Sequence, residues 1–154
     1  MKTYFSITVI TIILSSCLQR AQDDKTVKLD SIPKSLAPIS LEGCYEMIIA
    51  SDTAFMKIEQ NNNILNGTLK YKRKDKDSNT GNIILTKIAN RAEGYYTFQS
   101  EGQTSVRQII FKINNNSFSE AYGDIEMKSD TAVFKYPHAL NFEEKHSFNK
   151  IDCK

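Results

Sequence analysis

A regular alternation of strand-forming runs and turn residues dominates the chain from Gly43 to its end. Each run is short, apolar and rich in β-branched or aromatic residues, and clusters such as Asn61-Asn62-Asn63 and Asn114-Asn115-Asn116 separate successive runs. Turn signals every ~8–12 residues between alternating runs are typical of an antiparallel sandwich or barrel. The runs that read as strands are residues 44–50, 53–59, 64–73, 82–89, 94–101, 105–113, 117–122 and 132–136, with a last short one around residues 148–153.

No stretch of useful length in this region has the period of an amphipathic helix, so the sequence predicts an all-β fold. Strands joined in sequence order by hairpins leave exposed edges unless the sheet closes on itself. We therefore predict an antiparallel meander, in the form of a small lipocalin-like barrel of about eight strands. Hydrophobic residues make up 40% of the chain, which is enough to fill one compact core.

Alternation along the strands also predicts which side chains face the interior. If residues 94–101 pair with residues 104–111 through a two-residue turn at Gly102-Gln103, Phe98 lies opposite Arg107. Directly opposite residues of an antiparallel pair point to the same face of the sheet. Arg107 is therefore predicted to lie on the aromatic face.

The next hairpin extends this face by one strand. A turn at Asn115-Asn116 sets Phe111 opposite Glu120. Arg107, Glu120 and, further along, Asp124 are then predicted to point to the same side as the aromatic residues. An inward charge costs free energy unless it is paired.

Two interpretations of these inward charges stay open. In the first, Arg107 forms an internal ion pair with Glu120 or with Asp124 near the open end of the barrel. In the second, the charges form the polar floor of a ligand cavity. The residues predicted to line that cavity, beside Arg107 and Glu120, are Tyr96, Phe98, Phe111 and Tyr122.

The start of the chain predicts export and lipidation. Lys2 precedes an uncharged apolar run over residues 4–14, which is shorter than the roughly 20 residues that a membrane-spanning helix needs. Such a run is typical of a secretory signal peptide. The following Leu14-Ser15-Ser16-Cys17 resembles the bacterial lipobox, which implies removal of residues 1–16 and acylation, such as palmitoylation, of Cys17. The alternative is an ordinary signal peptide with an unrelated cysteine.

Residues 17–42 are predicted to form a flexible tether between the lipid and a domain over residues 43–154. Pro33, Pro38 and scattered charges interrupt any regular period there. Gln22-Asp23-Asp24 resembles an acidic signal for transfer to the cell surface, although a solvated linker explains it equally well. We expect a location in the bacterial cell envelope, anchored in the outer membrane and facing either the periplasm or the surface.

Two cysteines remain after Cys17, and they bracket the predicted domain. Cys44 begins the first strand and Cys153 lies at the end of the last. An exported protein folds in a compartment that permits disulfides. We predict a Cys44–Cys153 disulfide, worth on the order of 4–5 kcal/mol in the chain-entropy model because the loop is long. Two free thiols are the alternative.

Several short motifs occur in order along the domain: Gly43-Cys44-Tyr45, Gly67-Thr68-Leu69-Lys70-Tyr71, residues 74–81, residues 96–102 and Asp152-Cys153-Lys154. Together with the lipobox, they resemble a family of small, uncharacterised lipoproteins of Bacteroidota-type bacteria. The resemblance implies an exported, membrane-anchored β domain. It implies no activity and supplies no catalytic residues.

Other chemical patterns are weak. His138 and His146 lie eight residues apart, and no cysteine accompanies them at zinc-site spacing. Asp75 and Asp77 begin a calcium-like alternation, but Thr86 stands where a bidentate Glu belongs. No Gly-x-Ser-x-Gly elbow is present, and a formal net charge of +2 gives no reason to expect nucleic acid. We expect no metal, no cofactor and no enzymatic activity.

Two classes of function remain. The first is a non-catalytic binding or interaction module of the cell envelope, holding a small amphiphile or a protein partner. The second is a lysozyme-inhibitor-like lipoprotein that presents a loop to an external enzyme, suggested by the small disulfide-closed β domain and by the segment Ser119-Glu120-Ala121-Tyr122. That segment lacks the glycine after the serine that such inhibitors use.

Overall fold

The computed structural model describes residues 40–74 and 77–153. Residues 1–16, the lipidation residue Cys17 and nearly all of the predicted tether lie outside this part. The described residues contain no helix long and apolar enough to cross a membrane. Their strands are β1 (Gly43–Ile49), β2 (Asp52–Asn61), β3 (Ile64–Lys72), β4 (Asn79–Ile88), β5 (Arg91–Ser100), β6 (Gln103–Asn114), β7 (Ser117–Tyr122), β8 (Ile125–Lys128), β9 (Thr131–Phe134) and β10 (Asn141–Ile151).

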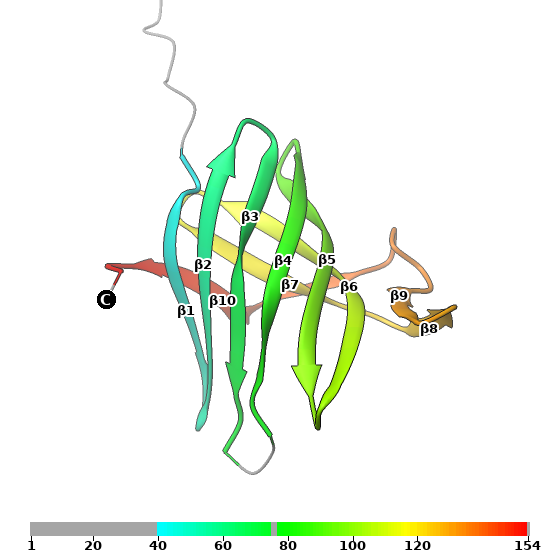
Figure 1. Cartoon of the computed structure of the whole chain (residues 1–154). Coiled ribbons are helices and arrows are strands. Elements are labelled where there is room, and N and C mark those ends of the chain that lie inside the picture. The colour runs from blue at the N-terminus through cyan, green and yellow to red at the C-terminus, as the bar shows by residue number, and fades with distance from the viewer. Residues whose placement is uncertain (1–39, 75–76, 154) are drawn as a thin grey trace, which may run out of the picture. The chain divides into compact units, whose positions relative to one another are not determined.

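A closed antiparallel barrel is formed by β1 to β7 and β10 (Figure 1). Each strand from β1 to β7 pairs with the next one in the sequence. β10 pairs with both β7 and β1, and this closes the sheet. The structure thus confirms the predicted all-β antiparallel meander and the small lipocalin-like barrel.

β8 and β9 form a hairpin outside the closed ring. β9 pairs in parallel with β6 at Val106–Thr131 and Arg107–Ala132, and β8 pairs only with β9 among the described strands. The sequence analysis predicted β9 through the run at residues 132–136 but was wrong about the strands on either side of it. It gave no strand at residues 125–128 and a final strand at residues 148–153, whereas β10 already begins at Asn141.

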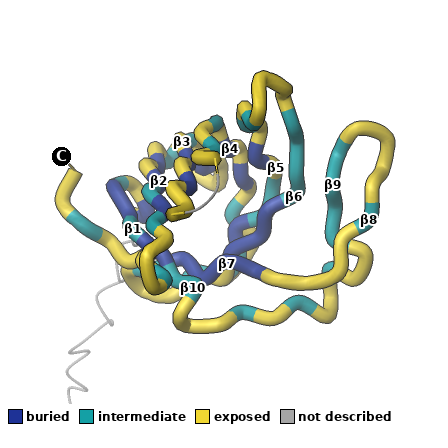
Figure 2. Tube along the Cα trace, turned by 90° about the horizontal axis from the view of Figure 1, so that it is seen from below, coloured by how far each residue is buried: buried dark blue, intermediate teal, exposed yellow. Residues whose placement is uncertain are grey.

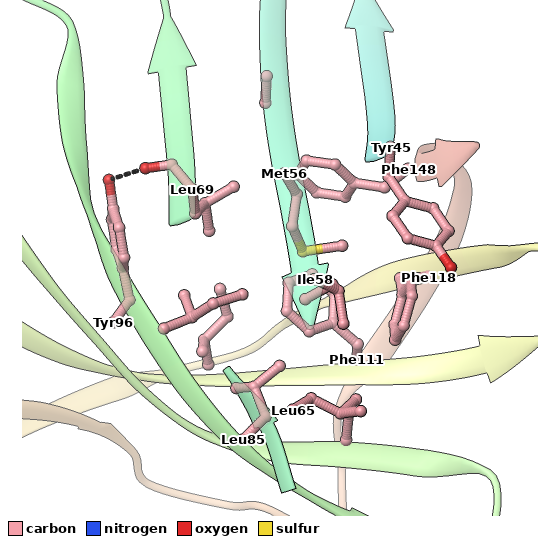
Figure 3. Packing of buried hydrophobic residues seen from close by; sticks show 14 of the residues in the cluster. Tyr45, Met56, Ile58, Leu65, Leu69, Leu85, Tyr96, Phe111, Phe118 and Phe148 are labelled. Carbon is pink, nitrogen blue, oxygen red and sulfur yellow. Dashed lines mark hydrogen bonds between the residues drawn. The ribbon is translucent and has the colours of Figure 1, made fainter. Parts of the chain in front are cut away.

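The barrel interior is filled with apolar side chains (Figure 3). Phe111 packs edge-to-face against Phe118 and Phe148, with ring centroids 5.8 Å apart in each pair. Burying each such side chain contributes about 1.5–3 kcal/mol. Figure 2 shows the same division along the chain, with buried segments on the barrel strands, exposed turns, and an outer hairpin that is mostly exposed along β8 and intermediate along β9. The largest fully buried side chains are Tyr45, Tyr96, Phe111, Phe118, Phe148, Met56, Ile58, Leu65, Leu69, Ile83, Leu85 and Ile109.

Two inward-facing glycines let neighbouring strands approach closely where the sheet curls. A Cβ on Gly67 would lie 1.9 Å from the Lys57 carbonyl oxygen, and a Cβ on Gly94 would lie 2.0 Å from the Ile84 carbonyl oxygen. Both distances are far inside contact distance. Only glycine therefore suits these two positions, as is common at barrel corners.

The predicted Cys44–Cys153 disulfide is present, with the two Cα atoms 5.2 Å apart. Cys44 lies on β1 and Cys153 follows β10, so the bond joins the two strands at which the barrel closes. The bridged residues are 109 positions apart in the sequence.

The β5–β6 hairpin turns one residue earlier than predicted, at Glu101-Gly102. Both residues have positive φ, 51° and 78°, as a type I′ turn requires, and this places glycine second rather than first. Phe98 consequently lies opposite Ser105, not opposite Arg107. Each partner moves by two residues, so the face on which every side chain lies is unchanged.

The folded domain begins before the predicted boundary at residue 43. Leu41 is 3% exposed. Its N–H donates to the Gln60 Oε1 at 2.8 Å, and its carbonyl accepts from the Tyr45 hydroxyl at 2.8 Å. Leu41, which the sequence analysis assigned to the tether, therefore belongs to the folded core.

Candidate functional site

Three polar side chains meet inside the barrel. The Tyr71 hydroxyl on β3 lies 2.8 Å from both carboxylate oxygens of Glu120 on β7. An Arg107 Nη on β6 donates to the Tyr71 hydroxyl at 3.0 Å and to the Glu120 Oε1 at 3.2 Å. We call these three residues the polar triad. The Glu120 side chain is 7% exposed and that of Arg107 is 33% exposed, so the triad runs from the core toward solvent.

Burial controls the proton affinities in the polar triad. It raises the pKa of the Glu120 carboxyl, while the Arg107 guanidinium and the hydrogen bond from Tyr71 oppose the rise. Burial and then the Glu120 charge raise the pKa of the Tyr71 hydroxyl well above its ordinary value. Burial alone would lower the pKa of Arg107, but Tyr71 and Glu120 raise it, so the guanidinium stays charged.

Two aromatic rings hold the Arg107 guanidinium. Its central carbon lies 5.2 Å from the Tyr71 ring centroid and 5.5 Å from that of Tyr96, within the range of cation–π contacts. Tyr96 is fixed in turn, because its hydroxyl donates to the Leu69 carbonyl at 3.0 Å and its ring stacks on Phe98 at 4.6 Å. These contacts leave Arg107 in one well-defined position.

The structure decides between the two predicted partners of Arg107. Arg107 forms its ion pair with Glu120. Asp124 is exposed beyond the end of β7, and its carbonyl accepts from the Lys135 N–H at 2.8 Å. β7 ends at Tyr122, so the alternation that was expected to carry Asp124 inward does not reach it.

The predicted cavity lining is split between core and surface. Tyr96 and Phe111 are fully buried within the hydrophobic core, and Phe98 packs against that core. Tyr122 is 39% exposed at the rim. Burial and the nearby Glu120 charge raise the pKa of Tyr122 to about 12.

Two small hollows open beside the polar triad, and Tyr122 lines both. One, of about 140 Å³, also reaches Tyr71 and Arg73. The other, of about 110 Å³, reaches Arg107 and Glu120 and lies under the outer hairpin. Sites for drug-sized ligands typically measure about 300–1,000 Å³. Each hollow can therefore hold a small group, such as a side chain, but not a whole lipid.

The sequence analysis missed Tyr71, which donates the shortest hydrogen bonds to the buried carboxylate. The alternation of Leu65, Gly67, Leu69 and Tyr71 along β3 does signal an inward tyrosine. However, Tyr71 and Glu120 are 49 residues apart in the sequence. They meet only because the barrel closes, which strand parity alone cannot reveal.

A second concave feature lies on the outer surface of the barrel, across β6, β7 and β10, and was also missed. We call it the outer groove. It has a volume of about 550 Å³ and is lined by Lys112, Asn114, Ser117, Ser119, Phe142, Glu144, Ser147 and Asn149.

Strand register arranges polar lining residues of the outer groove in two rows across β6, β7 and β10. The first row is Lys112, Ser119 and Ser147, and the second is Asn114, Ser117 and Asn149. Ser119 is 4% exposed, and its hydroxyl accepts from the Asn114 amide at 3.2 Å and lies 2.8 Å from the Ser147 hydroxyl.

The groove depends on an irregularity in β10. The β7–β10 register shifts between Phe142 and Ser147, so four residues of β10 have no partner on β7. Such an interruption bends a strand and redirects its side chains, and these features commonly lie beside binding sites. Asn115-Asn116 and the other turn signals gave no hint of this shift.

No metal site is formed in the described residues, where no group of three or more metal-ligating side chains comes together. His146 instead packs against Tyr122, with ring centroids 4.3 Å apart, and its Nδ1 lies 3.4 Å from a Glu143 carboxylate oxygen. Asp75 of the calcium-like loop lies outside the described residues.

Comparison with protein-family models, curated proteins and solved structures found no match to this chain.

Proposed function

We propose that this protein is a non-catalytic binding or interaction module of the bacterial cell envelope, held at the outer membrane by acylated Cys17. The observation that carries the proposal is that the interior of the barrel is already occupied by the protein's own side chains. Core side chains fill it, and the buried Glu120 carboxylate is engaged by Tyr71 and Arg107. The concave surfaces that stay open lie at the rim and on the outside.

A catalytic carboxylate has to reach the reacting atoms of its substrate. Glu120 is 7% exposed, and its oxygens already accept hydrogen bonds from two neighbours. Its geometry is that of an internal structural pair, which leaves surface recognition as the role that the described residues favour. Partners would then contact the rim around Tyr122 or the outer groove.

The lysozyme-inhibitor alternative rested on the small disulfide-closed β domain and on a presented loop at Ser119-Glu120-Ala121-Tyr122. In the structure this segment lies within β7, and its first three residues are buried. A buried strand cannot insert into an enzyme cleft without unfolding. We therefore keep the binding module as the single proposal.

Native mass spectrometry of the full chain, purified from the membranes of its own host, tests this proposal. We expect a fraction of the protein to carry a bound molecule or a partner that denaturation releases. Cys17→Ala should lose both fatty-acid labelling and membrane fractionation. A protein that keeps its label after this substitution, or that never carries or crosslinks to any partner, would contradict the proposal.

A further inference from the structure

The floor of the outer groove has unused hydrogen-bonding capacity. A serine hydroxyl has one donor and two acceptor sites, and Ser119 uses only part of this capacity on Asn114 and Ser147. In the neighbouring row, Ser117 lies between Asn114 and Asn149. The floor thus presents paired donors and acceptors on three hydrogen-bonded strands, where they are held in fixed positions.

The charges around the groove balance. Lys112 provides one ammonium group and Glu144 provides one carboxylate, and the other polar lining residues are serines and asparagines. A site for an anion such as phosphate would present an excess of positive charge. The balanced lining instead favours a neutral ligand that is rich in hydroxyl groups.

The shape of the groove suits a ligand larger than one sugar ring. Its volume of about 550 Å³ lies within the usual range for small-ligand sites, about 300–1,000 Å³. An adjoining hollow of about 360 Å³ shares Glu144, Ser147 and Asn149 and extends past Glu46 and Ile48 on β1. The two hollows form one continuous surface along β10.

An extended peptide is a poorer occupant. Ser117 and Ser119 on β7 pair with β6 on one side and with β10 on the other, so the backbone of the groove floor at these residues cannot accept an added strand. Phe142 is the one apolar residue in the lining of the outer groove itself, and Ile48 and Ile151 are the apolar residues of the adjoining hollow, so polar residues dominate both linings. An aromatic ring beside polar groups does suit the apolar face of a sugar.

We propose that the outer groove binds a neutral oligosaccharide. The inference rests on the proposed binding function, for which it names a ligand class and a site. Asn149 and Ser147 would donate to and accept from the sugar hydroxyls along one wall of the groove. Ser117 would contact the sugar from below, and the buried Ser119 hydroxyl would fix the position of the Ser147 hydroxyl.

Isothermal titration calorimetry and hydrogen–deuterium exchange test the groove with the full chain in a detergent that contains no sugar. The probes are maltose and N,N′-diacetylchitobiose at millimolar concentrations, with digalacturonic acid as the charged comparison. We expect at least one neutral disaccharide to bind more tightly than digalacturonic acid. It should slow amide exchange in peptides that cover residues 114–119 and 142–149.

Two groove variants and a matched control locate the site. Losing one hydrogen bond should weaken disaccharide binding about fivefold in Asn149→Ala and in Ser147→Ala. Asn82→Ala removes an equally exposed strand asparagine from the outer face of β4 and should change the affinity by less than about twofold. Circular dichroism verifies that all three variants fold.

Failure to bind either neutral disaccharide would overturn the inference, as would binding that neither groove variant weakens. Equal protection of the same peptides by a Gly-Ser peptide would assign the groove to proteins instead. If native mass spectrometry still finds a bound partner after such a result, the proposed binding function stands and only the groove assignment fails.

Discussion

The two halves of this barrel obey the rules of strand pairing to different degrees. In the regular half, β1 to β5, adjacent strands pair in unbroken registers. In the irregular half, β6 to β10, β6 and β7 share only the pairs from Phe111–Glu120 to Asn114–Ser117, and the β7–β10 register shifts. β9 of the outer hairpin pairs with β6 at Val106 and Arg107, outside the part of β6 that pairs with β7.

The difference shows where unusual chemistry can exist in a small β domain. Unbroken pairing enforces strict alternation, so the regular half contributes mainly apolar side chains to the interior. The irregular half keeps the same alternation on β7, which points Glu120 inward, but this strand has only a short pairing with β6 and a shifted pairing with β10. Both buried polar residues of the described part, Ser119 and Glu120, lie on β7.

The largest expected effect on stability comes from removing the Cys44–Cys153 disulfide, which links the regular half to the irregular half. Replacing Cys44 and Cys153 together by serine should lower the free energy of unfolding by about 4–5 kcal/mol, because the unfolded chain regains the freedom of a long loop. Urea unfolding with and without reductant measures this loss. A reduced protein as stable as the oxidised one would show that the halves hold together without the bond.

The next effect concerns the polar triad. Arg107→Ala should cost about 2–3 kcal/mol, less than a fully buried pair, because the guanidinium is a third exposed while Glu120 is left buried without its counter-charge. Replacing the triad with apolar residues, as Arg107→Met, Glu120→Leu and Tyr71→Phe, should recover most of the loss.

Thermal unfolding combined with binding of an anionic fluorescent fatty acid separates structure from function here. A structural triad predicts a destabilised Arg107→Ala protein and no specific uptake of the probe by either protein. If Arg107→Ala keeps its Tm but abolishes probe uptake seen in the wild type, the triad serves a ligand, and the two halves form one binding cavity.

The pH dependence of stability tests the raised pKa of Glu120. The folded state binds the proton more tightly than the unfolded state, so the free energy of unfolding should fall as pH rises from the unfolded carboxyl pKa to the folded one. Each unit of elevation contributes about 1.4 kcal/mol. Glu120→Gln should lack this slope. Parallel pH profiles for the two proteins would mean that Glu120 has an ordinary pKa.

The smallest effect is expected at the β5–β6 turn. Gly102 has a φ of 78° and nothing near its missing Cβ, so Gly102→Ala should cost about 1 kcal/mol through backbone strain alone. Ser51→Ala in the β1–β2 turn, where the residue does not have positive φ, is the matched control. Equal stability of the two variants would contradict the assignment of this turn.

The sequence allowed more to be predicted in one half than in the other, for a physical reason. Period-two alternation gave β1 to β7 within a few residues, and the Phe111–Glu120 pair was predicted correctly. The predicted β5–β6 register was wrong by two residues because the turn lies at Glu101-Gly102. This error did not change the face of the sheet on which each side chain lies.

The rest depended on contacts that no local pattern encodes. The Tyr71–Glu120 bond requires closure of the barrel, and the outer groove requires a shift within β10. The run at residues 132–136 did predict β9, but the parallel pairing of β9 with β6 breaks the meander rule, and β8 is only four residues long. Ile125 and Met127 on β8 are two-thirds exposed, so burial leaves no apolar signal there.

Native-state hydrogen exchange tests most directly the claim that the regular half, β1 to β5, is rigid and that the irregular half, β6 to β10, contains the segments that open locally. The account predicts that amides in the centres of β3 and β4 exchange only through global unfolding, whereas β8, β9 and residues 143–146 exchange through local opening at much lower free energy. Equal protection of amides in β3 and β8 would contradict this claim, because the irregular half would then be as rigid as the regular half.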